Sequence, residues 1–454
     1  MRIIIISEST YPWLRYIWEQ FSSINLLLTK YEFTTYNGSK VLGNLNEGSF
    51  LVEYAETQQY SNSFFIPLSN KFATDDYVWV KDDLPVYKGT ITHDGDYDLL
   101  YNAFVHLSRL EEWKSEKCGN FIGSYSSQHP RKNKVIWRIP VVNHLFNELE
   151  KRLKRIFPRV RFDRGTKPVI EFSHDVDYLE KTVQLRLKQT AFDFFNAGKR
   201  LIKRDLRGTF SKIKKGIGFA INKSDYWCFD YWERLESEFN IKSVYYFFAM
   251  AGVRKRYDLK QWLIDPSYNI SNNKRLKEKC KELMGKGNRI GLHGSYNSAM
   301  EEDLFIKEKE ALENAIAHKV SKTRQHWLNY YESKTPYIHE RAGIEEDSTI
   351  GFNDISGFRS GVASMYYPYD HGRQRPFSFK VIPLVVMDSH LYDYSNNNDT
   401  ADLNWLLDNM NKVKKFFVSV NWHQRVISPD YNWADSFSKI AMEYYINERN
   451  IQNK

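Results

Sequence analysis

Two aspartates one residue apart follow an apolar run in the segment EFSHDVDYL, residues 171 to 179. The preceding residues, KPVIEF, have the β-branched and aromatic character of a strand, and side chains two apart in a strand point to the same face. Asp175 and Asp177 are therefore expected to share one face. Because like charges at that spacing repel, the pair indicates a nearby cation, a shared proton or ample water. The alternative is that both carboxylates merely cap the next turn.

Other chemically active side chains also follow apolar segments. RIGL is followed by His293, FFVSV by a loop with His423, and TRQHWL supplies Arg324 and His326. In sheets with helical crossovers, reactive groups lie just beyond the carboxyl ends of the strands. We therefore expect these groups to meet the two aspartates at one site, although each histidine taken singly could be an ordinary buried residue. Asp388, after IPLVV, ends a further strand in the same way.

The elements that would position these groups alternate between strand and helix patterns from residue 166 onward. Such alternation predicts a parallel sheet with helical crossovers, either open or closed into a barrel. Residues 1–165 mix both patterns, beginning with a strand at MRIIII and ending with an amphipathic helix from Val142 to Ile156. The polar stretch FPRVRFDRGTKP separates the two parts. We expect an N-terminal α/β domain over 1–165 and a second domain over 166–454.

Composition places the chain among folded proteins. It has 454 residues with 42% hydrophobic and 16% aromatic content, enough for two or three cores. No apolar run approaches the roughly 20 residues of a membrane span, and the start lacks the pattern of a secretory signal. The three cysteines are scattered without a CxxC pair, which argues against a disulfide framework or a thiolate metal site. A cytoplasmic setting is therefore expected.

The positive charge is concentrated in one segment. Residues 181–223 contain twelve Lys or Arg and two acidic residues, a net charge of +10, while the whole chain carries +9. The remainder is close to neutral, which argues against a nucleic-acid-binding surface. The segment mixes Phe, Leu and Ile with its basic residues, as interfacial helices on anionic membranes do. A solvated or disordered insertion is the alternative, and the segment could also form a wall of the site.

In chain order, the segments SHDVDYL, RIGLHGSYNS, TRQHWLNY, GIEEDSTIGFNDISGFRSG, IPLVVMD and VNWHQRVIS resemble the motifs of the polysaccharide deacetylases. These are carbohydrate esterases with a NodB homology domain, and the closer resemblance is to the bacterial branch with an N-terminal α/β domain. The resemblance implies a deformed (β/α) barrel over 166–454, with the basic insertion at about 181–223. It also implies metal-assisted hydrolysis of an acetyl group from an amino sugar in a polysaccharide or lipid-linked glycan.

The same resemblance assigns the catalytic roles. Asp175 matches the general base and Asp177 a metal ligand, although Val176 separates them where most members have adjacent acids. Arg324 matches the arginine that holds the base, and His423 matches the histidine that protonates the departing amine. A guanidinium beside a buried carboxylate keeps it ionised, which suits a base at neutral pH.

The metal ligands depart from the family pattern. His293 matches the first histidine of the second motif, but Asn297 stands where the second histidine is expected. An amide oxygen is a poorer partner than imidazole for a transition metal. His326 is the candidate replacement, with a core or surface histidine as the open alternative. We expect a divalent metal, zinc being favoured, unless the metal is weakly held or absent.

Candidate substrate contacts are Asn297, Trp327, Arg359 and Trp422. Tryptophan rings suit stacking on sugar faces but are also ordinary core residues, and Arg359 could instead pair with Asp354. The expected partner is an N-acetylated saccharide, and the sequence leaves the oligomeric state open. Two alternative functions are a metal-dependent glycosyltransferase that uses the DxD pair, and a noncatalytic, carbohydrate-binding relative of the deacetylases.

Overall fold

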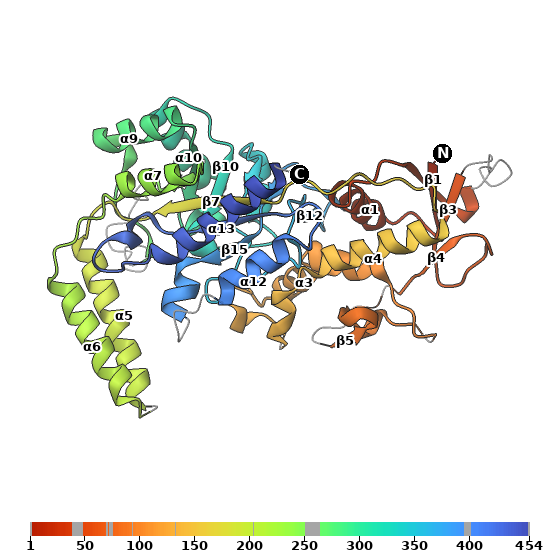
Figure 1. Cartoon of the computed structure of the whole chain (residues 1–454), viewed down its shortest axis with the longest axis horizontal. Coiled ribbons are helices and arrows are strands. Elements are labelled where there is room, and N and C mark those ends of the chain that lie inside the picture. Colours follow the sequence, from red (N-terminus) through yellow and green to blue (C-terminus); the bar gives the residue numbers. More distant parts are fainter. Residues whose placement is uncertain are drawn as a thin grey trace. The chain divides into compact units, whose positions relative to one another are not determined.

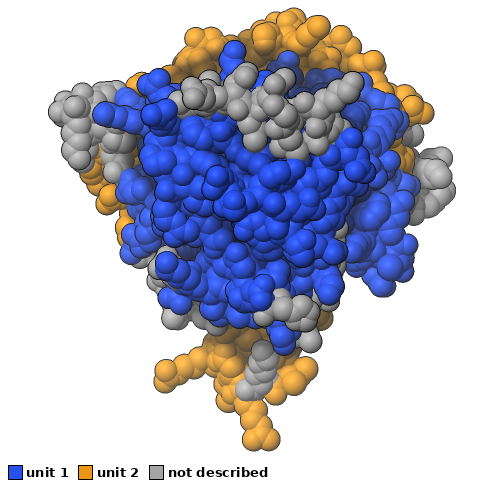
Figure 2. All heavy atoms as spheres, turned by 90° about the vertical axis from the view of Figure 1, so that its right-hand side faces the viewer, with its two compact units in different colours: residues 1–170, 330–386, 401–419 blue, residues 171–329, 387–400, 420–454 orange. Residues whose placement is uncertain are grey.

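The computed structural model describes residues 2–38, 49–69, 71, 76–92, 94–131, 133–202, 204–249, 264–394 and 401–452 (Figure 1). The chain divides into two compact units, coloured in Figure 2. Unit 1 comprises residues 1–170, 330–386 and 401–419, and unit 2 comprises 171–329, 387–400 and 420–454. The first crossing, after Ile170, lies close to the predicted boundary at 165/166. The sequence predicted two consecutive domains, and it did not predict that residues 330–386 and 401–419 belong to unit 1.

Unit 1 contains a four-stranded parallel sheet in the order β2-β1-β3-β4. The strands are β1 (Arg2–Ser7), β2 (Lys30–Thr35), β3 (Ser49–Ala55) and β4 (Phe64–Pro67). The predicted first strand is confirmed because four consecutive isoleucines of β1 are fully buried. Both faces of the strand must therefore be covered, as in other parallel sheets.

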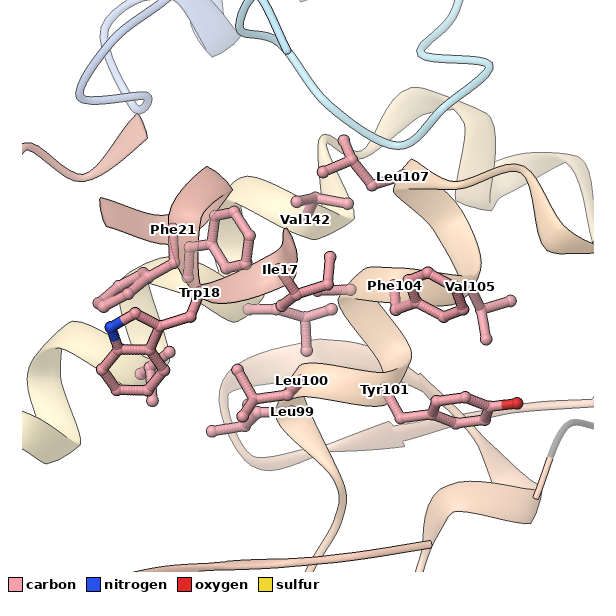
Figure 3. Packing of buried hydrophobic residues seen from close by; sticks show 14 of the residues in the cluster. Ile17, Trp18, Phe21, Leu99, Leu100, Tyr101, Phe104, Val105, Leu107 and Val142 are labelled. Carbon is pink, nitrogen blue, oxygen red and sulfur yellow. The ribbon is translucent and has the colours of Figure 1, made fainter. Parts of the chain in front are cut away.

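Four helices of unit 1 contribute to its core: α1 (Pro12–Ile24), α2 (Leu99–Leu107), α3 (Leu110–Lys117) and α4 (Val141–Ile156). Figure 3 shows Ile17 and Phe21 of α1 in one apolar cluster with Leu100 and Phe104 of α2 and Val142 of α4. The amphipathic helix predicted from Val142 to Ile156 is confirmed as α4. Its buried residues recur every three or four positions, which brings one face onto the core.

Shorter elements complete this part of the chain. They are β5 (Tyr77–Val80), β6 (Leu84–Tyr87), α11 (Thr335–Arg341), β11 (Glu346–Asp347), β12 (Tyr369–Asp370), β13 (Arg375–Pro376), β14 (Lys380–Val381) and α12 (Ala401–Met410). The pairs β5–β6 and β12–β13 are antiparallel.

The second sheet has eight strands in the order β14-β11-β10-β9-β8-β7-β16-β15. Its remaining members are β7 (Val169–Val176), β8 (Val244–Phe247), β9 (Arg289–Gly294), β10 (Lys322–Gln325), β15 (Leu384–Met387) and β16 (Phe417–Asn421). The neighbours β7–β8, β8–β9 and β9–β10 run parallel, so their carboxyl ends lie at one edge. The predicted mixed α/β fold with a deformed (β/α) barrel is confirmed.

The helices of unit 2 are α5 (Val183–Ile202), α6 (Leu206–Ile221), α7 (Phe229–Glu238), α9 (Lys274–Gly285), α10 (Glu302–Ile316) and α13 (Asp435–Gln452). The basic segment forms α5 and α6, which pack along each other as a hairpin (Figure 1). Asp205 caps α6 by accepting a hydrogen bond from the backbone N–H of Gly208 at 2.9 Å. Within the described residues, no helix has the length and apolar character to cross a membrane.

Candidate active site

Asp175 is buried near the carboxyl end of β7 and is held on both carboxylate oxygens. Arg324 donates from Nη1 to Oδ1 at 2.8 Å, and Asn421 donates from Nδ2 to Oδ2 at 3.0 Å. Burial alone would raise the pKa of Asp175, but the guanidinium of Arg324, followed by His293 and His423, brings it below its ordinary value. The side chain is therefore an ionised carboxylate in a fixed orientation.

Asp177 follows β7 directly and faces a different set of groups. Its Oδ2 accepts a hydrogen bond from Arg425 Nη1 at 2.7 Å. Its Oδ1 lies 3.3 Å from Nε2 of His293 and 3.9 Å from Nε2 of His326. Burial opposes ionisation here too, but Arg425 and the neighbouring histidines hold the pKa of Asp177 well below its usual range. The predicted aspartate pair thus does share one site, with a different partner for each acid.

Asp177, His293 and His326 form a donor group that fits a divalent metal, since their ligand atoms all lie within 4.8 Å of one another. Both rings present Nε2 to Asp177 because each Nδ1 has another partner: the Arg324 carbonyl oxygen at 3.0 Å for His293, and Asp265 Oδ1 at 3.1 Å for His326. Donation from Nδ1 leaves a lone pair on Nε2, the usual arrangement in metal-binding histidines.

The carboxylate of Asp177 can also accept a further ligand. Among the described residues, Oδ1 of Asp177 accepts no hydrogen bond of good geometry, although it is buried. Such an orphaned buried oxygen is costly unless a cation or a proton donor approaches it. Two imidazole nitrogens and one carboxylate oxygen are the donors that catalytic zinc sites use, with a further position left open. The residues present therefore fit the metal that the sequence predicted.

A sharp turn after β10 places His326. The next two residues, Trp327 and Leu328, have φ angles of 58° and 50°, a left-handed conformation uncommon for large side chains. Asn329 then donates to the carbonyl oxygen of Tyr296 at 2.7 Å, which ties this turn to the loop after β9. His293 in β9 and His326 in the turn directly after β10 thus follow from two neighbouring parallel strands, and loop contacts join them.

Asn297, at the departure from the family pattern, lies outside this donor group. It is half-buried and begins the short 3₁₀ turn Asn297–Ala299 in the loop after β9. His326 stands in the group instead, as predicted for the replacement histidine. The contribution of Asn297 to substrate binding remains a prediction.

His423 lies on the other side of Asp177 and is paired with Asp388. Its Nδ1 is 3.0 Å from both carboxylate oxygens of Asp388, which also accepts its backbone N–H at 2.7 Å. Nε2 lies 3.5 Å from Oδ2 of Asp177. Burial lowers the pKa of His423, but Asp388 and then Asp177 outweigh it and raise the pKa to about 9. At neutral pH the ring is an imidazolium that can donate from Nε2.

The first turns of α5 form a wall beside this group. Gln184 donates from Nε2 to the carbonyl oxygen of Asp265 at 2.9 Å, and Lys188 Nζ lies 5.1 Å from the centre of the Trp327 ring. Burial lowers the pKa of Lys188 to about 8, partly opposed by Asp177. The Trp327 side chain is 37% exposed and so retains a surface for a ligand. The basic segment therefore borders the site, one of the positions that the sequence allowed.

Two predicted substrate contacts are corrected by burial. Trp422 is fully buried and packs edge-on against Phe437 at 5.4 Å, so its ring has no free face for a sugar. Arg359 lies within unit 1, where its buried guanidinium donates to Glu112 at 2.8 Å and to the Gly351 carbonyl oxygen at 2.9 Å. Both are structural residues, and the Arg359 guanidinium contacts Glu112.

Three residues of the site were missed by the sequence interpretation: Asp265, Asn421 and Arg425. Asn421 and Arg425 flank His423 in VNWHQR, so the strand-end rule could have included them. Asp265, in the segment QWLIDPS, follows no apolar strand pattern. Only its position beside His326 assigns it to the site.

Comparisons with known proteins give structural likenesses alone. No family model matches the chain, and no curated protein does. Among solved structures, the chain is similar to a Mycobacterium smegmatis protein assigned to the polysaccharide deacetylases, at 14% identity and a TM-score of 0.35, covering 64% of this chain and 86% of that one. A polysaccharide deacetylase from Bacillus cereus matches at 9% identity and a TM-score of 0.30, covering 62% and 89%. A 4-alpha-glucanotransferase from Thermococcus litoralis matches at 10% identity and a TM-score of 0.34, and the match covers 62% of this chain and 37% of that one.

Proposed function

We propose that the protein is a metal-assisted hydrolase that removes an acetyl group from an amino sugar in a polysaccharide or lipid-linked glycan. The observation that carries this proposal is a fixed, ionised Asp175 together with an imidazolium at His423, both close to the Asp177, His293 and His326 donor group. Amide hydrolysis needs a base for the attacking water and an acid for the leaving amine. The cytoplasmic setting predicted from the scattered cysteines belongs to the same proposal.

The side chains take the following roles. Asp175 accepts the proton of the attacking water, while Arg324 and Asn421 keep its carboxylate ionised and oriented. His423 donates its Nε2 proton to the amine nitrogen so that the carbon–nitrogen bond can break, and Asp388 holds the ring through Nδ1. Asp177, His293 and His326 would hold a divalent metal, zinc being favoured, which when bound polarises the acetyl carbonyl and lowers the pKa of water.

Trp327 is the proposed sugar contact. Its ring is partly exposed and Lys188 lies beside it, so one face of a saccharide could stack while the ammonium group binds its hydroxyls. Asn297, in the loop after β9, remains a second candidate because its side chain is only half-buried.

The alternatives fit the site less well. A glycosyltransferase of the DxD type uses carboxylates on a cation that carries a nucleotide sugar, but both oxygens of Asp175 are already engaged by Arg324 and Asn421. Imidazole-rich donors also suit zinc better than the oxygen-preferring cations of such enzymes. A noncatalytic binding protein would have no use for a fixed base and a protonated acid near the same donor group.

The test is acetate release from N-acetylated chitooligosaccharides by the full chain after loading with zinc. The expected result is acetate with an equal amount of free amine, and a loss of about 10²-fold or more in Asp175→Asn with metal content retained. An O-acetylated xylooligosaccharide run in parallel separates amide from ester hydrolysis. Release from neither saccharide by metal-loaded protein would overturn the proposal, and thermal stabilisation by a nucleotide sugar with manganese would favour the glycosyltransferase.

A further inference from the structure

The α5–α6 hairpin, residues 183–221, carries most of its large apolar side chains on the outside. Eleven of the twenty large apolar side chains that are exposed in the described part of the chain belong to it: Val183, Leu187, Phe192, Phe194, Phe195, Leu201, Ile202, Leu206, Phe210, Ile217 and Ile221. Single exposed apolar residues are normal on soluble proteins, but a concentration of this kind marks an interaction surface.

Beyond its anchored end, where Leu185 and Phe219 pack in an apolar cluster with Tyr178 and Tyr226, the inside of the hairpin is small and polar. Ala197, Thr209 and Gly216 are buried in it, and Thr209 Oγ1 donates to the Ala197 carbonyl oxygen at 3.5 Å. Asp193 is fully buried and lies 3.7 Å from Lys212 Nζ. A helical pair in water normally packs large apolar residues inward, whereas small residues on the inside are typical of helices in lipid. The hairpin therefore has the arrangement expected for apolar surroundings.

One end of the hairpin is anchored, whereas the other, here the free end, makes no hydrogen bond or ion pair with another described segment of the chain. At the anchored end, Lys181 pairs with Asp430 at 2.8 Å and Gln184 donates to Asp265. Figure 1 shows the connection between α5 and α6 at the opposite end, away from β7 of the same unit. The free end carries four exposed apolar side chains in close succession, with exposed fractions of 54% for Leu201, 84% for Ile202, 59% for Leu206 and 70% for Phe210, and Val183 and Ile221 are also exposed at the anchored end.

Basic residues surround this free end. Lys199, Arg200, Arg204 and Arg207 lie within a few positions of the connection, where Asp205 is the nearby acid. The segment's charge of +10 repels a second copy of itself but complements an anionic surface. Long basic side chains can also bury their stems along lipid while their charges stay at the headgroups.

We propose that the free end of the hairpin inserts its apolar side chains into the headgroup and acyl boundary of an anionic lipid bilayer. Its basic residues bind the lipid headgroups, in the manner of interfacial amphipathic helices. Because the first turns of α5 border the candidate site through Gln184 and Lys188, unit 2 would act beside the membrane surface. This inference does not depend on the deacetylase proposal.

The experiment is flotation of the full chain with phosphatidylcholine vesicles prepared with and without phosphatidylglycerol. The wild type is expected to float with the anionic vesicles, less at high salt, and to remain at the bottom with neutral ones. The combined variant L201Q/I202Q/L206Q/F210Q should lower binding to anionic vesicles by about tenfold or more. L28Q/V135Q is the matched control, because both residues are 57% exposed outside the hairpin, and it should bind as the wild type does.

Two further measurements make every outcome decisive. Circular dichroism establishes that the variants fold, and light scattering reports the oligomeric state. Equal flotation with both vesicle types, flotation of the fourfold variant like the wild type, or no flotation at all would overturn the proposal. A dimer of the wild type without lipid that is lost in the fourfold variant would also overturn the proposal, because the apolar surface would then bind a second copy of the chain.

Discussion

Nδ1 of His326 lies 3.1 Å from Oδ1 of Asp265, and the same oxygen accepts the backbone N–H of Tyr296 at 2.9 Å. One carboxylate oxygen thus joins the turn after β10 to the loop that follows β9, the strand that contains His293. Burial lowers the pKa of His326, so the ring is neutral and its Nε2 lone pair faces Asp177. This contact explains how the site can assemble three ligands although position 297 is an asparagine.

His326→Ala is expected to remove most of the bound zinc, because it deletes one of three donors. Asp265→Asn should weaken zinc affinity by about 10- to 100-fold, since the carboxylate orients the imidazole and raises its basicity. Zinc content by mass spectrometry and competition with a chelator give both values. Asn297→Ala is the control and should retain full zinc content. Loss of zinc in Asn297→Ala with retention in His326→Ala would show that the ligand set is wrong.

Arg324→Gln is expected to move the acidic limb of the kcat/KM profile to higher pH. The guanidinium holds the pKa of Asp175 below its ordinary value against the effect of burial. A base works only when ionised, so activity falls as the pH drops through the pKa of Asp175. Without Arg324, burial is expected to raise that pKa by about one unit or more. Arg289→Gln, on exposed Arg289 of β9, is the control for loss of an arginine. An unchanged limb in Arg324→Gln would mean that Asp175 is not the base.

The strand-end rule accounts for the part of the site that the sequence could predict. Apolar runs identified β7, β9 and β16, and parallel neighbours must place their carboxyl ends at one edge. Asp175, His293 and His423 therefore come together by topology, whatever their function. Alternation of strands and helices left an open sheet or a barrel possible, and the resemblance of these segments to the deacetylase motifs implied the barrel.

Burial and loop geometry could not be predicted in this way. Trp422 is one residue from His423, yet directly after the end of β16 its side chain lies fully buried in the core. The GFRSG loop with Arg359 has the composition of a ligand-binding loop, but the guanidinium contacts Glu112, more than two hundred positions away in sequence. Asp265 reaches the site from a segment without a strand pattern. Contacts of this kind depend on tertiary packing, which local residue types do not encode.

Asp388→Asn is expected to shift the alkaline limb of the pH profile to lower pH. Asp388 is the main group that raises the pKa of His423 to about 9 against burial. The acid works only when protonated, so activity is lost as pH rises through that pKa, and removing the Asp388 charge lowers it. The pH dependence of kcat/KM measures the shift, with Asp354→Asn in unit 1 as the control. If the alkaline limb does not shift in Asp388→Asn, His423 is not the proton donor.

Arg359→Ala is expected to destabilise the protein by about 3 to 5 kcal/mol while leaving KM unchanged in the folded fraction. The guanidinium is buried, and its removal takes a partner from the buried carboxylate of Glu112. Arg373→Ala is the matched control, because Arg373 is 54% exposed and its ion pair with Glu340 at 3.5 Å should contribute less than about 1 kcal/mol. Urea melts and saccharide titrations give the two values. A raised KM with normal stability would restore the predicted substrate contact.

Glu308→Gln is expected to stabilise the protein at pH 8 but not at pH 4.5. Glu308 of α10 is fully buried below the loop after β9, where it accepts the backbone N–H of Ser295 at 3.0 Å, and burial raises its pKa from 4.5 to about 7. The folded state therefore favours the protonated acid, and stability falls as pH rises from about 4.5 to about 7, by up to about 3 kcal/mol. Glutamine stays neutral and avoids that loss, so its melting temperature should exceed the wild type's only above this range. Glu310→Gln is the control, because Glu310 is exposed on the same helix. An equal gain in melting temperature at both pH values in Glu308→Gln would show that the ionisation of Glu308 is not the cause.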